Sequence, residues 1–382
     1  MMSKIGDLVR EFCPDGVESK SLNDIGTFIR GAGIQKSELS EYGFPAIHYG
    51  EVHTRYGIAS DTVFSHIEKP KSGYRQVQWN DLIIVTTSED VAGVGKPLAW
   101  MGKDSPYVSG ETYIFRHKQN AKYLAYLLQD KEFQMKKRIH VTGTKVKRIH
   151  ESAFAKIKFP IPPIEVQDEI VFILDKFREL EVELEEELMV RKTQHSHYRD
   201  RIFSSSSKFE LKAVRELCVI KTGKKDVNQG NPNGQYPFFT CSRTHTYSDS
   251  YSFDTEALLI AGNGEVGLVQ YFHGKFEAYQ RTYVLSDFIN VQSQYLFQFL
   301  KAYLVEHLST LKQDGTISYI KLGMLADFMV PIPPFELQNE FISVFEKFGN
   351  LELALESEIA SRKSQYEYYR NKLLNFKELE LK

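Results

Sequence analysis

Residues 160–167 read Pro-Ile-Pro-Pro-Ile-Glu-Val-Gln, and residues 331–338 read Pro-Ile-Pro-Pro-Phe-Glu-Leu-Gln. The likeness extends over 45 positions, 159–203 against 330–374, at a constant offset of 171, and 19 of these positions are identical. A gap-free repeat of this length marks two copies of one structural element. Because the copies are kept a fixed number of residues apart, we expect the protein to measure a distance with them.

Each copy opens with a proline turn and continues as a long amphipathic helix. Proline fixes its own φ, lacks an amide donor and pushes its predecessor to extended conformations, so the helix begins after the turn. Apolar or long side chains then recur at steps of three and four residues, from Ile170 to Ile202 and from Phe341 to Leu373. This pattern is typical of a coiled-coil-like seam. With roughly 38 helical residues each helix would be a rod about 57 Å long, and two such rods are able to pair.

The last turns of each predicted helix replace the Phe and Leu of the seam by Arg, Tyr and His. Two interpretations of these turns remain open: they stack between the paired helices, or they dock another subunit. The docking candidates, identical in the two copies, are Arg191, Lys192, Tyr198 and Arg199, with Arg362, Lys363, Tyr369 and Arg370.

The segments that precede the two helices are related more loosely. Pro45 matches Pro237 at an offset of 192, while Thr112 matches Thr282 at an offset of 170. The first segment therefore has 22 additional residues, which we expect in a surface loop near residues 60–78.

Both segments contain apolar runs of the β type, then a Gly-rich stretch, then an aromatic stretch that predicts a helix over 123–133 and over 295–307. The sequence therefore predicts the α+β class: two mixed α/β units separated by two long antiparallel, coiled-coil-like helices, as an internal repeat with pseudo-two-fold symmetry. The predicted boundaries are 1–158 for the first unit, 159–205 for its helix, 206–330 for the second unit and 331–382 for its helix.

Composition excludes several classes of protein. No apolar run approaches the roughly 18 residues needed to span a bilayer, and the start of the chain lacks the apolar stretch of a signal peptide. We therefore expect a cytoplasmic protein with no membrane partner. Cys13, Cys218 and Cys241 are too few and too scattered for a disulfide framework or a zinc site, so we expect no metal.

The net charge of −2 is weak evidence against a nucleic-acid partner, because local basic patches set the field that a phosphate backbone meets. Such patches occur at 136–138, 145–148 and 221–225. No catalytic motif accompanies them: the chain has no G-x-x-x-x-G-K-[ST] loop, no H-E-x-x-H and no G-x-S-x-G elbow. We expect no catalytic residue and no cofactor in this chain.

Two similar but divergent units at a set spacing suit a two-part site on double-stranded DNA. Phosphate contacts would fix the register, and different side chains in each unit would read the base edges. Divergent units imply unlike half-sites, and the helices would set the number of unread base pairs between them.

The order of these elements resembles the specificity subunit of type I restriction-modification systems. The resemblance rests on a globular unit followed by a Pro-Ile-Pro-Pro-x-Glu-x-Gln helix, with Arg-Lys near its end, taken twice, and on the opening Glu11–Glu18. It implies that each unit is a target recognition domain and that the helices bind two methylation subunits, on which restriction subunits dock. S-adenosylmethionine, ATP and Mg²⁺ would reside on those partners, as would all the catalysis.

Residues outside the helices carry no motif of that family, so the DNA-binding candidates rest on their chemistry and on equivalent placement in the two units. Arg, Asn and Gln can make bidentate base contacts, while Lys and Thr more often hold phosphates. The candidates are Lys36, Arg55, Thr87, Ser88, Lys145, Lys147 and Arg148 in the first unit, and Lys224, Lys225, Arg243, Asn263, Arg281, Gln313 and Thr316 in the second.

Two other classes of protein remain open. One is an enzyme with an unrecognised site, which modification of DNA by the purified chain alone would reveal. The other is a helical scaffold that joins protein partners without a DNA role. Loss of DNA binding after neutralising the loop lysines, with the fold intact, would count against the scaffold.

Overall fold

The computed structural model describes residues 2–204, 209–311 and 319–379. The chain divides into two compact units, which we call unit 1 (Met1–Glu183 with Ile359–Lys382) and unit 2 (Leu184–Glu358). In the described ranges, none of the helices combines the length and apolar character needed to cross a lipid bilayer.

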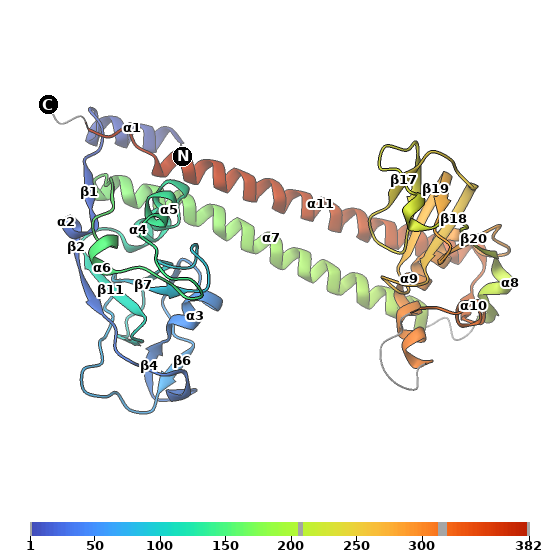
Figure 1. The fold of residues 1–382 in the computed structure, drawn as a ribbon, viewed down its shortest axis with the longest axis horizontal. Helices are drawn as coiled ribbons and strands as arrows, with labels where there is room; N and C mark the ends of the chain where they lie inside the picture. Colours follow the sequence, from blue (N-terminus) through green and yellow to red (C-terminus); the bar gives the residue numbers. More distant parts are fainter. Residues whose placement is uncertain (1, 205–208, 312–318, 380–382) are drawn as a thin grey trace. The chain divides into compact units, whose positions relative to one another are not determined.

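The two long helices predicted from the repeat are present (Figure 1): α7 covers Ile164–Ser204 with 41 residues, and α11 covers Phe335–Leu374 with 40. They pair antiparallel in each unit. In unit 1 the rings of Phe177 and Tyr369 stack at 5.3 Å, and Glu181 pairs with Lys363 at 3.4 Å. As the residue number rises on one helix it falls on the other.

Unit 2 has the same antiparallel pairing of the two helices. Lys192 Nζ lies 2.7 Å from Glu356, and His195 Nδ1 lies 2.7 Å from Glu352. Tyr198 packs on Phe348 at 5.6 Å between ring centroids, which is the counterpart of the Tyr369–Phe177 stack in unit 1. The predicted antiparallel helices are thereby confirmed.

Unit 1 contains a five-stranded sheet in the order β2-β11-β7-β9-β5 and a four-stranded sheet in the order β10-β4-β6-β3. Helix α4 packs on β7 and β9. The strands are β1 (Ser19–Ser21), β2 (Gly26–Arg30), β3 (Leu39–Ser40), β4 (Phe44–Ile47), β5 (Ala59–Ser60), β6 (Ser65–Ile67), β7 (Leu82–Val85), β8 (Thr87–Ser88), β9 (Pro97–Trp100), β10 (Tyr107–Val108), β11 (Thr112–His117), β12 (Lys147–Arg148) and β13 (Lys158–Pro160). The short helices are α1 (Met2–Phe12), α2 (Leu22–Ile25), η1 (Lys36–Glu38), α3 (Tyr49–Thr54), α4 (Ala121–Leu128), α5 (Lys131–Arg138) and α6 (Glu151–Phe154).

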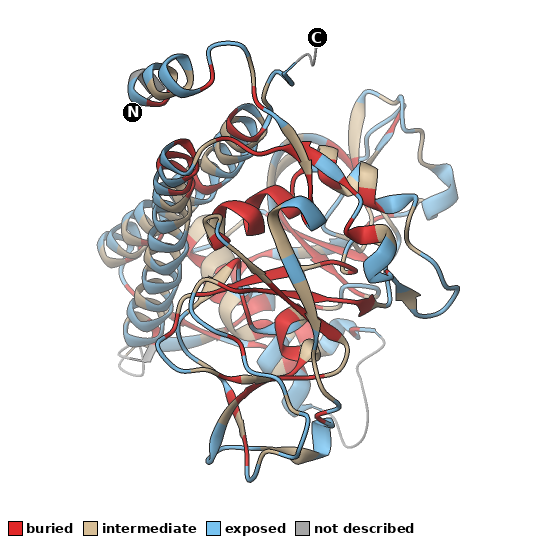
Figure 2. Ribbon diagram, turned by 90° about the vertical axis from the view of Figure 1, so that its left-hand side faces the viewer, coloured by how far each residue is buried: buried red, intermediate tan, exposed pale blue. Residues whose placement is uncertain are grey.

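Unit 2 contains a six-stranded sheet in the order β15-β20-β18-β19-β16-β17, against which α9 packs through β18 and β19. Its strands are β14 (Glu210–Ala213), β15 (Val219–Thr222), β16 (Tyr236–Phe239), β17 (Thr246–Ser248), β18 (Phe253–Ala261), β19 (Val269–Ala278), β20 (Thr282–Ser286) and β21 (Met329–Ile332). Its helices are α8 (Val214–Leu217), η3 (Val227–Gln229), α9 (Ser293–Thr310) and α10 (Leu322–Ala326). Figure 2 shows the buried residues gathered on the sheets and on the helices that cover them.

Each unit has the same arrangement of three core strands, and the two units differ in the segments inserted between these strands. The antiparallel set β2-β11-β7 corresponds to β15-β20-β18. The predicted helix over 123–133 is broken, because Asp130 caps a second helix through the amide of Glu132 at 2.9 Å, whereas 295–307 lies within one helix.

The 22 additional residues of unit 1 are spread more widely than the sequence suggested. Pro45 pairs with His66 across twenty intervening residues, and its counterpart Pro237 pairs with Tyr247 across nine. Half of the excess therefore lies between β4 and β6, where unit 1 adds α3. The expectation of a single loop near 60–78 was wrong, because short insertions at several strand ends give the same difference in offset.

The glutamine that both copies of the proline turn share has the same structural role in each unit. Gln167 donates to the carbonyl of Pro162 at 2.8 Å and accepts from the amide of Asn120 at 3.0 Å. Gln338 does the same with Pro333 at 2.9 Å and with the amide of Gln292 at 2.8 Å. Both side chains are fully buried. Each glutamine thus ties the start of a long helix to the start of the helix on the sheet, α4 or α9.

Candidate nucleic-acid interface

The two units present the same backbone framework where three core strands end. In unit 1 the amide of Thr86 donates to the carbonyl of Glu111 at 2.9 Å, and that of Ile149 donates to Thr86 at 3.1 Å. In unit 2 the amide of Gly262 donates to Arg281 at 2.9 Å, and that of Ile320 donates to Gly262 at 2.7 Å. We call these positions the strand-end sites. They comprise Arg30, Thr86–Ser88, Glu111 and Lys147–Ile149 in unit 1, and Thr222, Gly262–Asn263, Gln280–Arg281 and Tyr319–Ile320 in unit 2.

Four of the seven candidates predicted in unit 1 meet at its strand-end site. Thr87 pairs with Arg148, and Ser88 pairs with Lys147, between β8 and β12. Lys147 Nζ donates to the carbonyl of Gly143 at 2.9 Å. A fifth candidate, Lys145, is exposed in the turn just before β12. Thr87 itself is only 6% exposed, so its neighbours rather than its own hydroxyl are available to a ligand.

The other two candidates in unit 1 have different surroundings. Arg55 pairs with Glu51 at 3.2 Å and lies over the ring of Phe64 at 4.2 Å. Lys36 is exposed on η1. Among the described residues, no hydrogen bond or ion pair joins either side chain to the strand-end site.

In unit 2 the structure brings Asn263 and Arg281 together at the strand-end site, with Arg243 close by. Arg243 is exposed and pairs with Glu265 at 2.9 Å, and the amide of Glu265 donates to the carbonyl of Cys241 at 3.1 Å. Cys241 in turn lies with its Sγ 3.4 Å from the carbonyl of Arg281. The candidates Gln313 and Thr316 lie outside the described residues.

Lys224 is exposed beside β15, but its neighbour Lys225 is held in a polar network. Lys225 Nζ pairs with the fully buried Glu277 at 3.3 Å and donates to Ser248 and Ser250 at 2.7 Å each. The lysine compensates a buried carboxylate, and this role accounts for its position without DNA.

Replacing Lys225 by alanine is expected to lower the stability of unit 2 by about 2 kcal/mol, because Glu277 keeps its buried charge without the cation. Hydrogen exchange at the amides of β18 and β19 would measure the loss. Lys224→Ala is the matched control and should leave that exchange unchanged. Equal exchange in the two variants would contradict the structural role of Lys225.

Lys137 holds the loop at residues 92–94 of unit 1 in place. From the sequence alone, this lysine is counted in a basic surface patch. Lys137 is fully buried, and its Nζ donates to the carbonyls of Ala92 at 3.2 Å and Val94 at 2.5 Å. Burial lowers the pKa of Lys137 to about 8. Its spacing of one helical turn after Phe133, which is also buried, was the available signal.

Because the pKa of Lys137 lies at about 8 in the folded state, below the ordinary lysine value of 10.5, the unfolded chain binds this proton more tightly. The unfolding free energy should therefore rise as pH increases through this window. We expect Lys137→Met to lose that rise and Lys136→Met to keep it. Urea unfolding at several pH values measures the difference, and parallel curves for wild type and Lys137→Met would exclude it.

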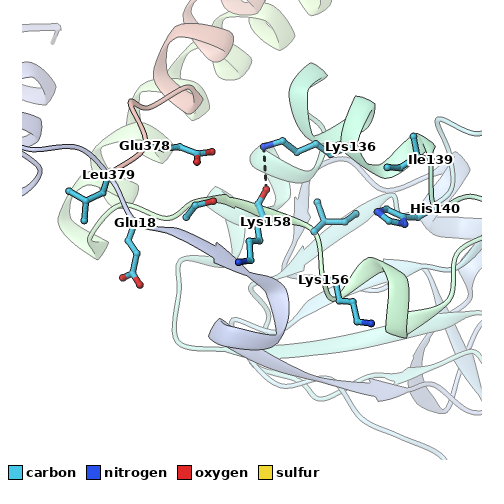
Figure 3. A pocket seen from close by; sticks show the side chains of 10 residues that line it. Glu18, Lys136, Ile139, His140, Lys156, Lys158, Glu378 and Leu379 are labelled. Atoms are coloured by element: carbon cyan, nitrogen blue, oxygen red, sulfur yellow. Dashed lines mark hydrogen bonds between the residues drawn. The ribbon is translucent and has the colours of Figure 1, made fainter. Parts of the chain in front are cut away.

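Three lysines of unit 1 line a cavity of about 530 Å³. Figure 3 shows Lys136, Lys156 and Lys158 at this cavity, with Glu18 and Glu378 also on its wall. Lys136 Nζ donates to the carbonyl of Lys158 at 3.3 Å and pairs with Glu132 at 2.8 Å. Since carboxylates share the wall, the cavity has mixed charge and we assign it no ligand.

The predicted partner-binding residues of the helices all make contacts within the chain. Arg191 and Arg362 each donate to the glutamine three residues on, at 2.9 and 3.0 Å. Lys192, Lys363, Tyr198 and Tyr369 contact the facing helix as described above. Arg199 pairs with Asp200 at 2.8 Å, and Arg370 lies 5.6 Å from the ring of Tyr366. The stack between helices, one of the two interpretations, is therefore present at Tyr198 and Tyr369, and docking by the eight residues stays a prediction.

Comparison with known proteins bears on the role of this architecture. The family model described as the type I restriction modification DNA specificity domain matches the chain twice, over residues 14–190 and 206–362. The chain belongs to this family. This specificity subunit therefore serves DNA sequence recognition within a type I system and is not its catalytic component.

Relatives of this specificity subunit support the assignment. It is 37% identical to the specificity subunit of the type I restriction enzyme EcoDI of Escherichia coli over 142 residues, which is 37% of this chain and 31% of that protein. A putative type I specificity subunit of Mycoplasma pneumoniae is 30% identical over 244 residues, covering 58% of this chain and 97% of that protein.

The fold is similar to that of a solved type I S subunit from M. genitalium. The TM-score is 0.62 at 13% sequence identity, and the match covers 94% of this chain and 96% of that one. This likeness concerns the fold. Among the residues that the structure describes, no group of His, Cys, Asp and Glu side chains could hold a metal ion.

Proposed function

We propose that this chain reads a bipartite, asymmetric DNA site with a gap of fixed length, one half-site for each target recognition domain (1–158 and 206–330). The helical segments 159–205 and 331–382 would carry two methylation subunits, through which restriction subunits dock. A solved structure with a similar fold is described as concerning complex assembly of the type I restriction-modification system, which supports a role within a larger assembly. S-adenosylmethionine, ATP and Mg²⁺ would be held by those partners.

One observation carries the DNA-reading part of the proposal: the strand-end sites share a backbone framework and differ in their side chains. Where unit 1 has Thr87 opposite Arg148, unit 2 has Asn263 opposite Tyr319. A common framework holds both sites in the same geometry, while different donors and acceptors suit different base edges. Unlike half-sites follow from this arrangement.

Matched apolar residues on the two helices support docking of two copies of one partner. Leu180 and Leu351, which are equivalent in the repeat, are 45% and 40% exposed. The next matched pair, Val182 and Leu353, is 50% and 65% exposed. Exposed large apolar side chains on a helix favour a protein interface. The apolar periodicity counted Leu180 and Leu351 in the seam between the helices, whereas Val182 and Leu353 were not singled out by the sequence.

The experiment selects DNA from a random duplex library with the chain co-purified with its methylation subunit, and reads the sites of adenine methylation. A two-part motif with a fixed gap is the expected result. Deleting one helical turn from both α7 and α11 should change that gap, because each helix is continuous between the two units. A folded complex that selects no motif and shows no salt-sensitive binding to DNA would favour the helical scaffold instead.

A further inference from the structure

We propose that Glu111 and Arg281 occupy one equivalent base-reading position in the two units and give the half-sites different bases there. The proposal rests on the DNA-reading function above and deepens it. It assigns a cytosine contact to Glu111 and a guanine contact to Arg281.

The equivalence of the two positions is set by the backbone. Each residue directly precedes a Thr-Tyr pair that opens the central strand, β11 or β20. Each carbonyl accepts from the amide of the residue that follows β7 or β18, Thr86 or Gly262, at 2.9 Å. The α-carbons are therefore held alike, while the side chains carry opposite charges.

In the part of the chain that the structure describes, the exposed Arg281 and the half-buried Glu111 are both free of the ion pairs that engage three of the charged candidates. The Arg281 side chain is exposed, and within the described part of the chain no hydrogen bond or ion pair engages its guanidinium. Glu111 accepts one long contact from Thr86 Oγ1 at 3.4 Å and has no ion-pair partner among the described residues. Arg55, Lys225 and Arg243 are all paired with carboxylates.

Arg281 lies at a cavity, next to a buried polar atom that has no hydrogen-bond partner among the described residues. Arg281 lines a cavity of about 340 Å³ together with Thr222, Gln280, Tyr283 and Tyr319. Next to Gly262, which also lines it, the side-chain oxygen of Asn263 is buried and has no hydrogen-bond partner among the described residues. A buried polar atom without a partner is uncommon in a native structure and marks a place where a ligand can complete the bonding.

The chemistry of the two side chains selects different bases. The guanidinium of arginine donates two parallel hydrogen bonds to O6 and N7 of guanine in the major groove. A carboxylate can only accept, which suits the N4 amino group of cytosine and opposes both phosphates and guanine. A carboxylate that faced DNA without contacting a base would weaken binding to every sequence equally. A change of base preference at one position on replacing Glu111 would therefore show that Glu111 contacts a base.

The test repeats the library selection with the methylation complex of three variants: Glu111→Gln, Arg281→Gln and Arg281→Lys. Arg281→Gln should lower discrimination at one base of one half-site by on the order of tenfold or more and leave the other half unchanged. Glu111→Gln should do so at one base of the other half. Arg281→Lys keeps the charge but lacks the planar fork, so it too should lose the guanine preference.

The matched controls are Glu11→Gln in α1 and Arg215→Gln in α8, both exposed charged residues outside the strand-end sites. They should leave every position of the motif unchanged. Melting temperatures close to that of wild type establish that the variants are folded. If Arg281→Gln does not fold, Arg281→Lys tests the same position.

Two failures are distinguishable. If wild type selects a two-part motif and the strand-end variants retain all of it, with only a uniform change in affinity, then Glu111 and Arg281 do not read bases although the proposed function stands. If the wild-type complex selects no motif, the proposed function is wrong and the inference falls with it.

Discussion

Phe203→Ala is expected to lower the unfolding free energy of unit 2 by about 4 kcal/mol, the range typical of a fully packed core phenylalanine. Phe203 lies at the end of α7 and is 6% exposed. Its ring is surrounded by Tyr295, Phe299, Tyr303 and Phe345, with centroids 5.1–5.9 Å away. Truncation leaves a cavity between α7, α9 and α11 that three helices cannot close.

The measurement is urea unfolding followed by far-UV circular dichroism, together with hydrogen exchange in α9. Phe172→Ala provides the control, because it removes the same atoms from a residue of α7 that is 49% exposed. That variant should lose less than about 1 kcal/mol. Equal losses in the two variants would show that Phe203 does not join the long helix to the core of unit 2.

Gln167→Ala is expected to destabilise unit 1 by about 3 kcal/mol, because it leaves the buried carbonyl of Pro162 and the partly buried amide of Asn120 without partners. Besides the contacts to Pro162 and Asn120, Gln167 donates to the side chain of Gln119 at 2.6 Å. Gln167 is fully buried, so solvent does not take over the hydrogen bonds that its side chain makes. The start of α4 should loosen before the sheet does.

Tryptophan fluorescence suits this measurement because both tryptophans, Trp79 and Trp100, belong to unit 1. The unfolding midpoint in urea should fall for Gln167→Ala. The control Gln365→Ala removes an exposed glutamine of α11 and should stay within about 0.5 kcal/mol of wild type. A Gln167→Ala midpoint equal to that of the control would contradict the bridging role.

The repeat let the sequence predict the largest elements of the fold. Proline chemistry at 160–163 and apolar periodicity are local properties, so the start, length and antiparallel pairing of α7 and α11 could be predicted without coordinates. The break between α4 and α5 could not, because the cap at Asp130 competes with an otherwise helical apolar pattern. The placement of the insertions could not be predicted either. A difference in offset gives the number of inserted residues but not where along the chain they are inserted.

The candidate site shows the same division. Basic and amide residues at equivalent places indicated loops that the structure brings together, with Thr87 beside Arg148 in unit 1 and Asn263 beside Arg281 in unit 2. DNA binding by these residues stays a prediction. Glu111 was missed because a search for DNA contacts favours cations. Lys225 looked like its exposed neighbour Lys224, since nothing in the local sequence reveals a carboxylate on a distant strand.

The amino-acid sequence by itself determined the family, the duplication and the two long helices, because these depend on local backbone chemistry and on periodicity along one chain. Only the tertiary structure decided which charged side chains are consumed by internal partners and which remain available. That distinction depends on contacts such as Lys225 with Glu277 or Lys137 with the carbonyl of Val94. The partners are 52 and 43 residues apart in the chain, and the cost of leaving a buried charge or carbonyl unpaired, rather than any local preference, brings them together.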